Sequence, residues 1–447
     1  MSHPSEEILI RFALRDRDAL VDQAAIATHV ELCDSCRSFV EDVAEFDRVA
    51  ADPQAWWLSS EILSGKSRAP LLDFRDRLQH EDEDAEKLLG PLLTSSYKFA
   101  YADIARKPAY RTGGVVRLLC REANRQCERE PLYALTLAET ADLIARALPD
   151  DYYPADNVWR LRGDALVEIA IACRYLGGRF QPAYESLDRA TQLYSRLLSC
   201  ERDLARIAYV RGTVQWNQQR YEEAVDEERR AATLFTLVGD SDGVNRARLT
   251  EGIVLMRLRD FRAAKNVFQA LYASAAETNR DLDRARTASS LSDCLIQTGD
   301  TDEALQFAFE AEAIFRAHCL FTEVARVQWT IAYAMLVAGN VANAILRFRS
   351  VLGQFSELGM ESDAALAKLD LVEAYVVLGQ FQYALETVSD ITRYFTIHQM
   401  LPGALTAAAF LQEAAREERL TRAHVSDVRD YLRRLSNEPE LAFVRPE

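Results

Sequence analysis

The sequence lacks any long apolar run and any concentration of positive charge. No stretch of its 447 residues approaches the ~18–20 consecutive apolar residues that a membrane helix requires. The first residues, MSHPSEEILIRF, lack the basic start and the apolar core of a secretory signal. The formal net charge is −16, and no basic run is present that would neutralise nucleic-acid phosphates. These absences predict a cytoplasmic protein that binds neither a membrane nor nucleic acid directly.

Catalytic sequence motifs are absent as well. The chain contains no G-x-x-x-x-G-K-[ST] phosphate-binding loop, no G-x-G-x-x-G, no G-x-S-x-G and no H-E-x-x-H. Six of the eight cysteines are isolated in sequence of helical character, which is usual for buried reduced thiols: Cys120, Cys127, Cys173, Cys200, Cys294 and Cys319. The sequence therefore predicts neither an enzyme nor a disulfide framework.

Helical periodicity dominates what is present. Ala, Leu, Arg and Glu are abundant, and no segment shows the sustained apolar–polar alternation of a strand. Hydrophobic residues make up 49% of the chain and charged residues 27%, which is ordinary for a folded protein. The predicted fold class is all-α.

A repeat of about 40 residues runs through the chain from near residue 165. Six segments align without gaps on an alanine: Ala183, Ala224, Ala264, Ala304, Ala344 and Ala384. By subtraction, the successive spacings are 41, 40, 40, 40 and 40. Such a period predicts helix pairs that stack on one another, because each pair exposes an apolar face that only its neighbour buries.

Other positions recur with the same period. Small residues stand twelve positions before four of the alanines, namely Gly212, Gly252, Ser292 and Ala332. Glycines stand five positions before four of them, namely Gly178, Gly299, Gly339 and Gly379. Aromatic residues dominate three positions before and eleven positions after, namely Phe180, Tyr221, Phe261 and Phe381, and Tyr194, Phe235, Phe315, Phe355 and Phe395. We expect the small residues at close helix crossings, the glycines in the turn, and the aromatic residues in the core.

These residues resemble the tetratricopeptide repeat in a long form of about 40 residues. The resemblance implies an α-solenoid over residues 111–436, with a peptide or protein bound on its concave face. Within it, residues 113–148 are expected to form a helix pair with Ala134 as the packing alanine, and residues 403–436 a capping pair. Residues 51–110 are expected to be a linker containing helices, and residues 437–447 a tail. In that linker, HEDEDAEK (80–87) is expected to be a solvated helix start.

The stretch THVELCDSC, residues 28–36, carries the most specific chemistry. His29, Cys33 and Cys36 stand at i, i+4 and i+7, so a helix places all three on one face. An imidazole and two thiolates are ligands that Zn²⁺ prefers, and a closed tetrahedral site needs a fourth. His3, in HPSEEIL, is the candidate for it. The predicted metal site is therefore His3, His29, Cys33 and Cys36, with Zn²⁺ as the metal.

The two stretches HPSEEILIRFA and THVELCDSC together resemble the zinc-associated domain of anti-sigma factors. The resemblance covers about residues 1–50 and implies the same four ligands, with a sigma factor or similar transcription partner that is kept from RNA polymerase. Charge favours a basic protein partner: residues 1–90 contain 20 acidic and 10 basic residues, which gives −10 of the total −16.

The role of the zinc stays open between two interpretations. In the first, the metal is a structural staple for a module too small to bury a sufficient core. In the second, oxidation of Cys33 and Cys36 releases the metal and the partner. For the whole chain, the leading interpretation is a cytoplasmic anti-sigma-like regulator whose repeats bind a second protein or peptide. The alternative is a helical-repeat scaffold in which the zinc module is purely structural.

Overall fold

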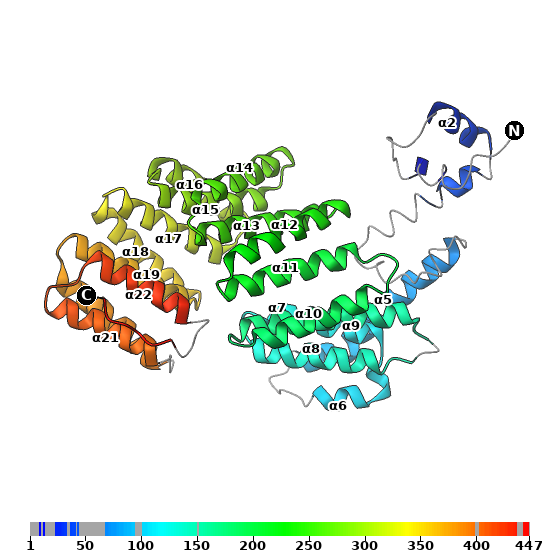
Figure 1. Cartoon of the computed structure of the whole chain (residues 1–447), viewed down its shortest axis with the longest axis horizontal. Coiled ribbons are helices and arrows are strands. Elements are labelled where there is room, and N and C mark those ends of the chain that lie inside the picture. The colour runs from blue at the N-terminus through cyan, green and yellow to red at the C-terminus, as the bar shows by residue number, and fades with distance from the viewer. Residues whose placement is uncertain are drawn as a thin grey trace. The chain divides into compact units, whose positions relative to one another are not determined.

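The computed structural model is built of helices joined by turns, and the described residues 441–446 after the last helix have no regular structure (Figure 1). The described residues are 9, 12–13, 23–33, 36–41, 43, 68–93, 101–149, 152–397, 402–435 and 441–446. No strand occurs among them, so the prediction of an all-α fold is confirmed. None of the helices in these ranges combines the length and the apolar character that a bilayer span requires.

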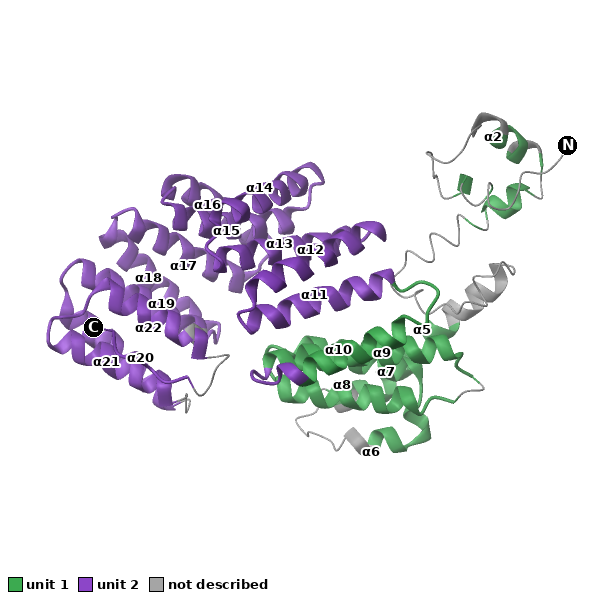
Figure 2. Ribbon diagram, in the orientation of Figure 1, with its two compact units in different colours: residues 1–175, 182–200 green, residues 176–181, 201–447 purple. Residues whose placement is uncertain are grey.

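The chain divides into two compact units (Figure 2). Unit 1 comprises residues 1–175 and 182–200, and unit 2 comprises residues 176–181 and 201–447. The elements of unit 1 are α2 (Gln23–Leu32), α5 (Arg68–Leu93), α6 (Tyr101–Arg106), the 3₁₀ helix η2 (Pro108–Tyr110), α7 (Gly113–Gln126), α8 (Pro131–Arg146), α9 (Ala155–Tyr175) and α10 (Phe180–Tyr194). The predicted boundaries near residues 50, 110 and 436 stay predictions.

Unit 2 is a regular series of helix pairs followed by a terminal pair. The regular helices are α11 (Glu201–Asn217), α12 (Tyr221–Leu237), α13 (Ser241–Arg257), α14 (Phe261–Glu277), α15 (Asp281–Thr298), α16 (Thr301–Ala317), α17 (Phe321–Val337), α18 (Val341–Glu357), α19 (Glu361–Val377) and α20 (Phe381–Ile397). The terminal helices are α21 (Pro402–Arg416) and α22 (Arg422–Leu435). Each helix packs on the next, and the first helices of neighbouring pairs also contact one another. The result is an α-solenoid of tetratricopeptide-like repeats, as predicted.

Small residues allow the helices of each pair to approach closely. All six repeat alanines have no exposed surface. A Cβ atom added at Gly252 of α13 would lie 2.3 Å from the ring of Phe268 in α14, and one added at Gly212 would lie 2.6 Å from a carboxylate oxygen of Glu228. Because no real Cβ approaches so closely, a larger residue would force the two helices apart. The predicted role of the small positions is confirmed.

The aromatic residues eleven positions after the alanines fill the core between the pairs. The exposed fraction is 1% for Tyr194, 3% for Phe235, 1% for Phe315, 0% for Phe355 and 4% for Phe395. The aromatic residues three positions before the alanines are only half-buried, because each begins the second helix of its pair.

The turn inside each pair of unit 2 has one residue in the left-handed conformation, and the turn between α9 and α10 has two, Gly177 and Gly178. The predicted glycines have positive φ, with +87° at Gly299, +82° at Gly339 and +67° at Gly379. At the same position of two other pairs stand Gln219 and Arg259, each with φ of +61°. A side chain costs roughly 1 kcal/mol or more in this conformation, so packing between the helices, rather than the turn residue, fixes the turn there. The turns between pairs show the same conformation at Gly239, Asn279, Cys319 and Gly359, which the sequence analysis did not identify.

The acidic run of residues 80–87 is not a solvated helix start, and that expectation was wrong. It lies in the middle of α5, and α5 packs on α7. Glu81 accepts hydrogen bonds from the hydroxyl of Tyr153 at 2.8 Å and from the backbone N–H of Gly114 at 3.2 Å. Arg117 of α7 donates to Asp82 at 2.8 Å. One face of the run therefore packs on α7, with Ala85 buried and Glu86 3.2 Å from Arg121. The exposed residues are His80, Glu83, Asp84, Glu86 and Lys87.

The terminal pair packs differently from the others. Helix α22 contacts α19 as well as α21. Arg429 of α22 is 9% exposed and reaches Asp370 at 2.6 Å and Glu373 at 2.8 Å, both in α19. Arg422 also binds Glu373, at 2.7 Å. The predicted capping pair is therefore held to the last regular pair by buried ion pairs.

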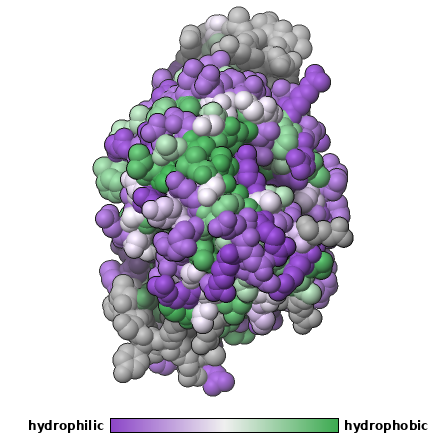
Figure 3. All heavy atoms as spheres, turned by 90° about the vertical axis from the view of Figure 1, so that its left-hand side faces the viewer, coloured by the Kyte–Doolittle hydropathy of each residue, from purple (hydrophilic) through white to green (hydrophobic). Residues whose placement is uncertain are grey.

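Figure 3 shows the left-hand side of Figure 1, where apolar side chains form a patch surrounded by hydrophilic ones.

Candidate metal centre and repeat surface

The three described ligand residues follow one another along nearly continuous helical turns. His29 lies in the last turn of α2, Cys33 follows the helix directly, and Cys36 begins the helical residues 36–41. The backbone N–H of Cys33 donates to the carbonyl oxygen of His29 at 2.9 Å. The backbone N–H of Arg37 donates to the carbonyl oxygen of Cys33, also at 2.9 Å. These helical bonds keep the i, i+4, i+7 face that the sequence predicts.

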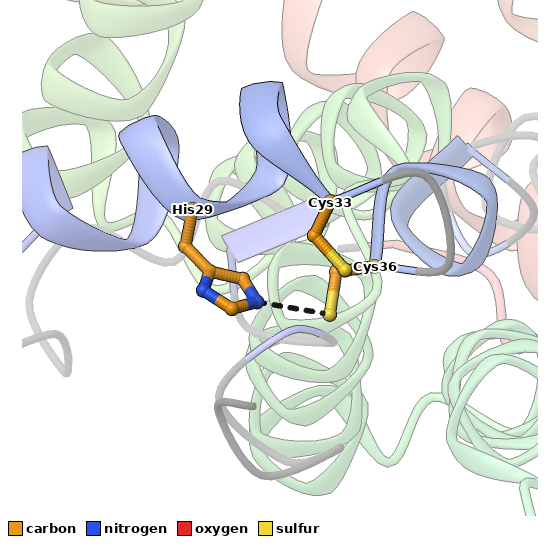
Figure 4. Close-up of side chains that lie close together, drawn as sticks. All are labelled: His29, Cys33 and Cys36. Carbon is orange, nitrogen blue, oxygen red and sulfur yellow. Dashed lines mark hydrogen bonds between the residues drawn. The ribbon is translucent and has the colours of Figure 1, made fainter. Parts of the chain in front are cut away.

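The side chains of His29, Cys33 and Cys36 converge (Figure 4). Their ligand atoms all lie within 4.8 Å of one another, and Nε2 of His29 is 3.4 Å from Sγ of Cys36. Zinc bonds of ~2.0–2.3 Å at tetrahedral angles place two ligand atoms about 3.5 Å apart. The distance between imidazole nitrogen and thiol sulfur therefore suits a shared zinc ion.

The site is partly enclosed by a small apolar cluster. Cys36 is 4% exposed, and His29 and Cys33 are half-buried. Cys36 shares the cluster with Leu9 and Val30, and Phe12, Ile26, Phe39 and Val40 pack around it. Burial raises the pKa of the Cys36 thiol, and the neighbouring Cys33 raises it further. A positive ion would oppose this effect, because metal binding stabilises the thiolate over the thiol.

The donor set fits zinc, although its fourth member lies outside the described residues. One imidazole and two thiols match the nitrogen and sulfur ligands of structural zinc sites. His3, predicted to complete the tetrahedron, belongs to the undescribed part of the chain, so its role stays a prediction. With four protein ligands, a zinc ion would link the chain near residue 3 to α2 and to residues 36–41, and it would stabilise the module as a crosslink.

Unit 2 carries a second set of ionisable residues on the first helices of its pairs. Asp293 of α15 is exposed, and it accepts a hydrogen bond from the hydroxyl of Thr330 in α17 at 3.0 Å. Loss of surrounding water raises the pKa of Asp293 to about 6, while Thr330 and Arg257 act in the opposite direction. Two pairs farther along, Asp370 of α19 accepts a hydrogen bond from the indole N–H of Trp329 in α17 at 2.6 Å. Nothing in the sequence singles out these acids, because only the fold brings their partners to them.

Comparison with solved structures shows the fold. The crystal structure of aspartyl phosphate phosphatase F from Bacillus subtilis is similar, with 14% sequence identity and a TM-score of 0.52 over 88% of this chain and 95% of that one. A Rap protein complexed with competence and sporulation factor is 15% identical, with a TM-score of 0.47 over 73% of this chain and 93% of that one. The Rap conjugation gene regulator of plasmid pLS20 in complex with the Phr* peptide is 12% identical, with a TM-score of 0.44 over 95% and 97%.

At such identity, the likeness to the Bacillus subtilis protein shows a shared helical-repeat architecture and nothing about activity. No family model matches the sequence, and no curated protein matches it.

Proposed function

We propose that this chain is a regulatory protein that acts by binding other proteins at two separate sites. The amino-terminal module holds zinc through His29, Cys33 and Cys36, with His3 as fourth ligand, and binds a transcription partner of the sigma-factor kind. The tetratricopeptide-like repeats bind a second protein or a peptide.

One observation supports the first half of the proposal most strongly. Three potential zinc ligands converge within 4.8 Å, beside a small apolar cluster of the module's described residues. This arrangement and the HPSEEIL start are the features that resemble the zinc-associated domain of anti-sigma factors. Zinc in such a site supplies folding free energy and orients the helices that form the binding surface. Inhibition of the transcription partner then follows from steric occlusion, because a partner covered by the module is unable to contact RNA polymerase.

Charge supports a basic partner for this module. Residues 1–90 contribute −10 of the net charge of −16. An acidic surface attracts a basic DNA-binding protein over a distance of about 10 Å at moderate salt, which speeds association and makes it sensitive to ionic strength. We therefore expect the complex to weaken as salt is raised.

The architecture of unit 2 supports the second half. Stacked helix pairs bury their shared faces and leave an extended surface along the first helices of the pairs. Polar and charged residues at repeated positions of these helices are exposed, including Arg246, Arg286 and Arg326. Such a surface suits binding of an elongated ligand better than chemistry at a single enclosed point.

The test is retention of partners from host extract by the full-length chain and by the Cys33→Ser, Cys36→Ser double variant. Cys319→Ser serves as a matched control, because Cys319 is exposed in a turn of unit 2. We expect a sigma factor to be retained by the unchanged chain and by the control, and to be lost with the double variant.

Retention of the same partners by all three proteins, with no sigma factor among them, would contradict the anti-sigma proposal. The chain would then be a helical-repeat scaffold in which the zinc module is purely structural. Treatment of the retained complex with hydrogen peroxide and with diamide separates the two roles of the zinc. Release by either oxidant indicates a redox switch at the paired thiols, and a complex unchanged by both excludes it.

A further inference from the structure

Large apolar side chains are exposed where the last two regular pairs of unit 2 pass from their first helix to their second. The turns concerned join α17 to α18 and α19 to α20. The exposed fractions of these side chains lie between 36% and 63%, and we call the five residues the turn patch: Val337, Leu346, Val377, Leu378 and Tyr383. Contiguous exposed apolar surface of this kind marks interaction sites more often than isolated exposed residues do.

The turn patch belongs to two chain segments without charge. No Asp, Glu, Lys or Arg occurs in residues 327–346 or in residues 374–385, although such residues make up 27% of the chain. The corresponding turns of the three earlier pairs all carry charge: Arg220, Glu222 and Glu223, then Arg257, Arg259 and Asp260, then Asp300, Asp302 and Glu303. Depletion of charge and an exposed tyrosine are typical of the core of a protein interface.

The two turns form one surface. The first residues of α18 and α20 pack in the same apolar cluster, and α19 lies against α17, α18 and α20. Residues 38 apart on neighbouring second helices are in contact elsewhere in unit 2, as the 2.7 Å bond from Tyr272 to Glu310 shows. Leu346 and Tyr383 are 37 apart on α18 and α20, so we infer that they are neighbours as well.

Tyr383 is held in place before any partner binds. Its ring stacks on that of Tyr375, a buried residue of α19, with the ring centres 5.5 Å apart. The hydroxyl of Tyr375 in turn accepts hydrogen bonds from Arg349 of α18 at 2.8 and 3.0 Å. An aromatic side chain that is fixed in advance loses little conformational entropy when a partner covers it.

The polar side chains around the turn patch suit a second copy of the same surface. Apart from Tyr383, the exposed polar side chains of residues 337–346 and 377–385 are all amides: Asn340, Asn343, Gln380 and Gln382. An amide carries donors and an acceptor, so it is able to bond to another amide, whereas a carboxylate repels its own copy.

The net charge points to the same occupant. Two copies of a chain with a charge of −16 repel each other over most of their surface. The nearest charged residues in sequence lie at the border of the turn patch. Arg347 is directed to α16, where its guanidinium lies 5.7 Å from the ring centre of Phe309, and Glu386 accepts a hydrogen bond from Gln382 at 3.0 Å. The uncharged turns therefore let two copies meet without like charges at the centre of the contact.

We propose that the turn patch is a contact between two copies of this chain that are related by a two-fold axis. Such a contact uses the same surface on both copies, so the apolar side chains of one patch pack on those of the other. The contact is independent of the two partners proposed above.

The size of the turn patch indicates a weak dimer. Four helix ends, each about 10 Å across, cover on the order of 400 Å² per copy. Standard interfaces bury about 800 Å² per partner, and smaller ones belong to transient complexes. We therefore expect a dissociation constant on the order of 10–100 μM.

The experiment measures sedimentation velocity of the full-length chain over a concentration range that spans this dissociation constant. The variants Leu346→Glu and Leu378→Glu each change one of the two turns. The control is Leu237→Glu, which adds the same charge at the end of α12, where the leucine is 72% exposed outside the turn patch. All three leucines are exposed, so the fold should be kept, and thermal melting checks this.

We expect the unchanged chain to pass from monomer to dimer with concentration. Each patch variant should raise the dissociation constant at least about tenfold, because the two-fold axis places two new carboxylates in an apolar contact. The control should change the constant less than about twofold, because its charge is screened. A chain that stays monomeric throughout, or a dimer that neither patch variant weakens, would overturn the proposal.

Ionic strength separates this contact from one held by ion pairs. Raising the salt from about 50 mM to about 500 mM screens the repulsion between the copies, so the dimer should be kept or strengthened. A dimer that weakens with salt would contradict an uncharged contact. If the chain is monomeric and both patch variants lose a protein from host extract that the control retains, the turn patch binds that protein, and the assignment to a second copy is wrong.

Discussion

The amino-terminal module and the repeats of unit 2 achieve a folded state in different ways. In the described residues up to 43, the buried apolar side chains are those of Leu9, Val30 and Cys36. By contrast, one continuous cluster in unit 2 runs from Ala332 to Leu435. The repeats bury large apolar surfaces against their neighbours, and every added pair extends the same core. Among the described residues of the module this apolar cluster is small, and their most specific contacts are those among a histidine and two cysteines.

This contrast indicates where each part obtains its stability. A core that is built from repeated pairs distributes its free energy over many van der Waals contacts, so a single change weakens it without removing it. A module with few buried side chains depends on a small number of strong interactions. Substitutions in the two regions should therefore differ in the size of their effect on stability.

The largest effect is expected from loss of metal at the module. The Cys33→Ser, Cys36→Ser double variant removes two of the predicted ligands, so we expect stoichiometric zinc in the unchanged chain and none in the variant, by elemental analysis. Structural zinc contributes ~10 kcal/mol or more of apparent binding free energy in small modules. The module should therefore unfold while the repeats keep their melting temperature. Equal zinc content in both proteins would contradict the assignment of the ligands.

A core aromatic residue tests the repeats. Phe268 has no exposed surface and packs where Gly252 leaves room for its ring. Phe268→Ala should destabilise unit 2 by about 3–5 kcal/mol in denaturant unfolding, because it removes apolar burial and leaves a cavity. The matched variant is Phe309→Ala in α16, whose ring is 42% exposed. A similar loss in both variants would show that burial between the helices is not what stabilises the solenoid.

The buried ion pairs between α19 and α22 are expected to matter slightly less. Arg429→Met leaves the carboxylates of Asp370 and Glu373 without their shared buried partner, and we expect a loss of roughly 3 kcal/mol in thermal unfolding of unit 2. Arg393→Met is the control, since Arg393 binds Asp390 at 3.1 Å and is 71% exposed. Surface pairs of this kind contribute about 0–1 kcal/mol. An equal effect of the two substitutions would mean that α22 is not anchored by its arginine.

The turns give a smaller effect of opposite sign. Gln219 and Arg259 adopt φ of +61°, where glycine has no steric cost. Gln219→Gly should stabilise unit 2 by about 0.5–1 kcal/mol, despite the greater flexibility of glycine in the unfolded chain. The reverse substitution Gly299→Ala, at φ of +87°, should destabilise it by a similar amount. The denaturant midpoints of the two variants measure both changes in stability. Midpoint shifts of the same sign in the two variants would refute this explanation of the turn.

The fold was largely predictable from the sequence, because the repeated residues are those that make the contacts between neighbouring helices. Each alanine and each small residue lies against a helix close in sequence, so the period of 40 residues carries the packing information. The bond between Glu81 and Tyr153 joins residues 72 positions apart and leaves no comparable pattern. For that reason the acidic run looked solvated in the sequence. The turns at Gln219 and Arg259 were hidden for another reason, since neither residue type favours positive φ.

The metal site was predictable in part. His29, Cys33 and Cys36 are near in sequence, and helical spacing alone brings them together. His3 depends on how the chain before α2 folds back, and spacing does not fix that. Arginines recur at intervals of 40 residues, at Arg206, Arg246, Arg286 and Arg326, but the sequence does not show which acids lie near them. Only the structure shows that Arg280 lies against the carboxylates of both Asp242 and Asp283.

The smallest expected effect concerns pH in unit 2. The pKa of Asp293 is raised to about 6, so the folded state holds this proton more tightly than the unfolded chain. The resulting stabilisation is fully present below about pH 4 and is lost as pH rises through about 6. Because the carboxylate is exposed, solvent reduces the effect to less than about 1 kcal/mol. Asp293→Asn should flatten the stability of unit 2 between pH 4 and 6, and an unchanged pH profile would refute the raised pKa.

The contrast between the two regions is tested most directly by hydrogen exchange of the full-length chain, followed by mass spectrometry, with zinc and after chelation. The account predicts that amide protection in residues 23–43 is lost when the metal is removed, while protection in helices α11–α22 is unchanged. If the protection of residues 23–43 survives chelation, this prediction is contradicted. The module would then be stabilised by its own packing, and His29, Cys33 and Cys36 would not be metal ligands that hold it folded.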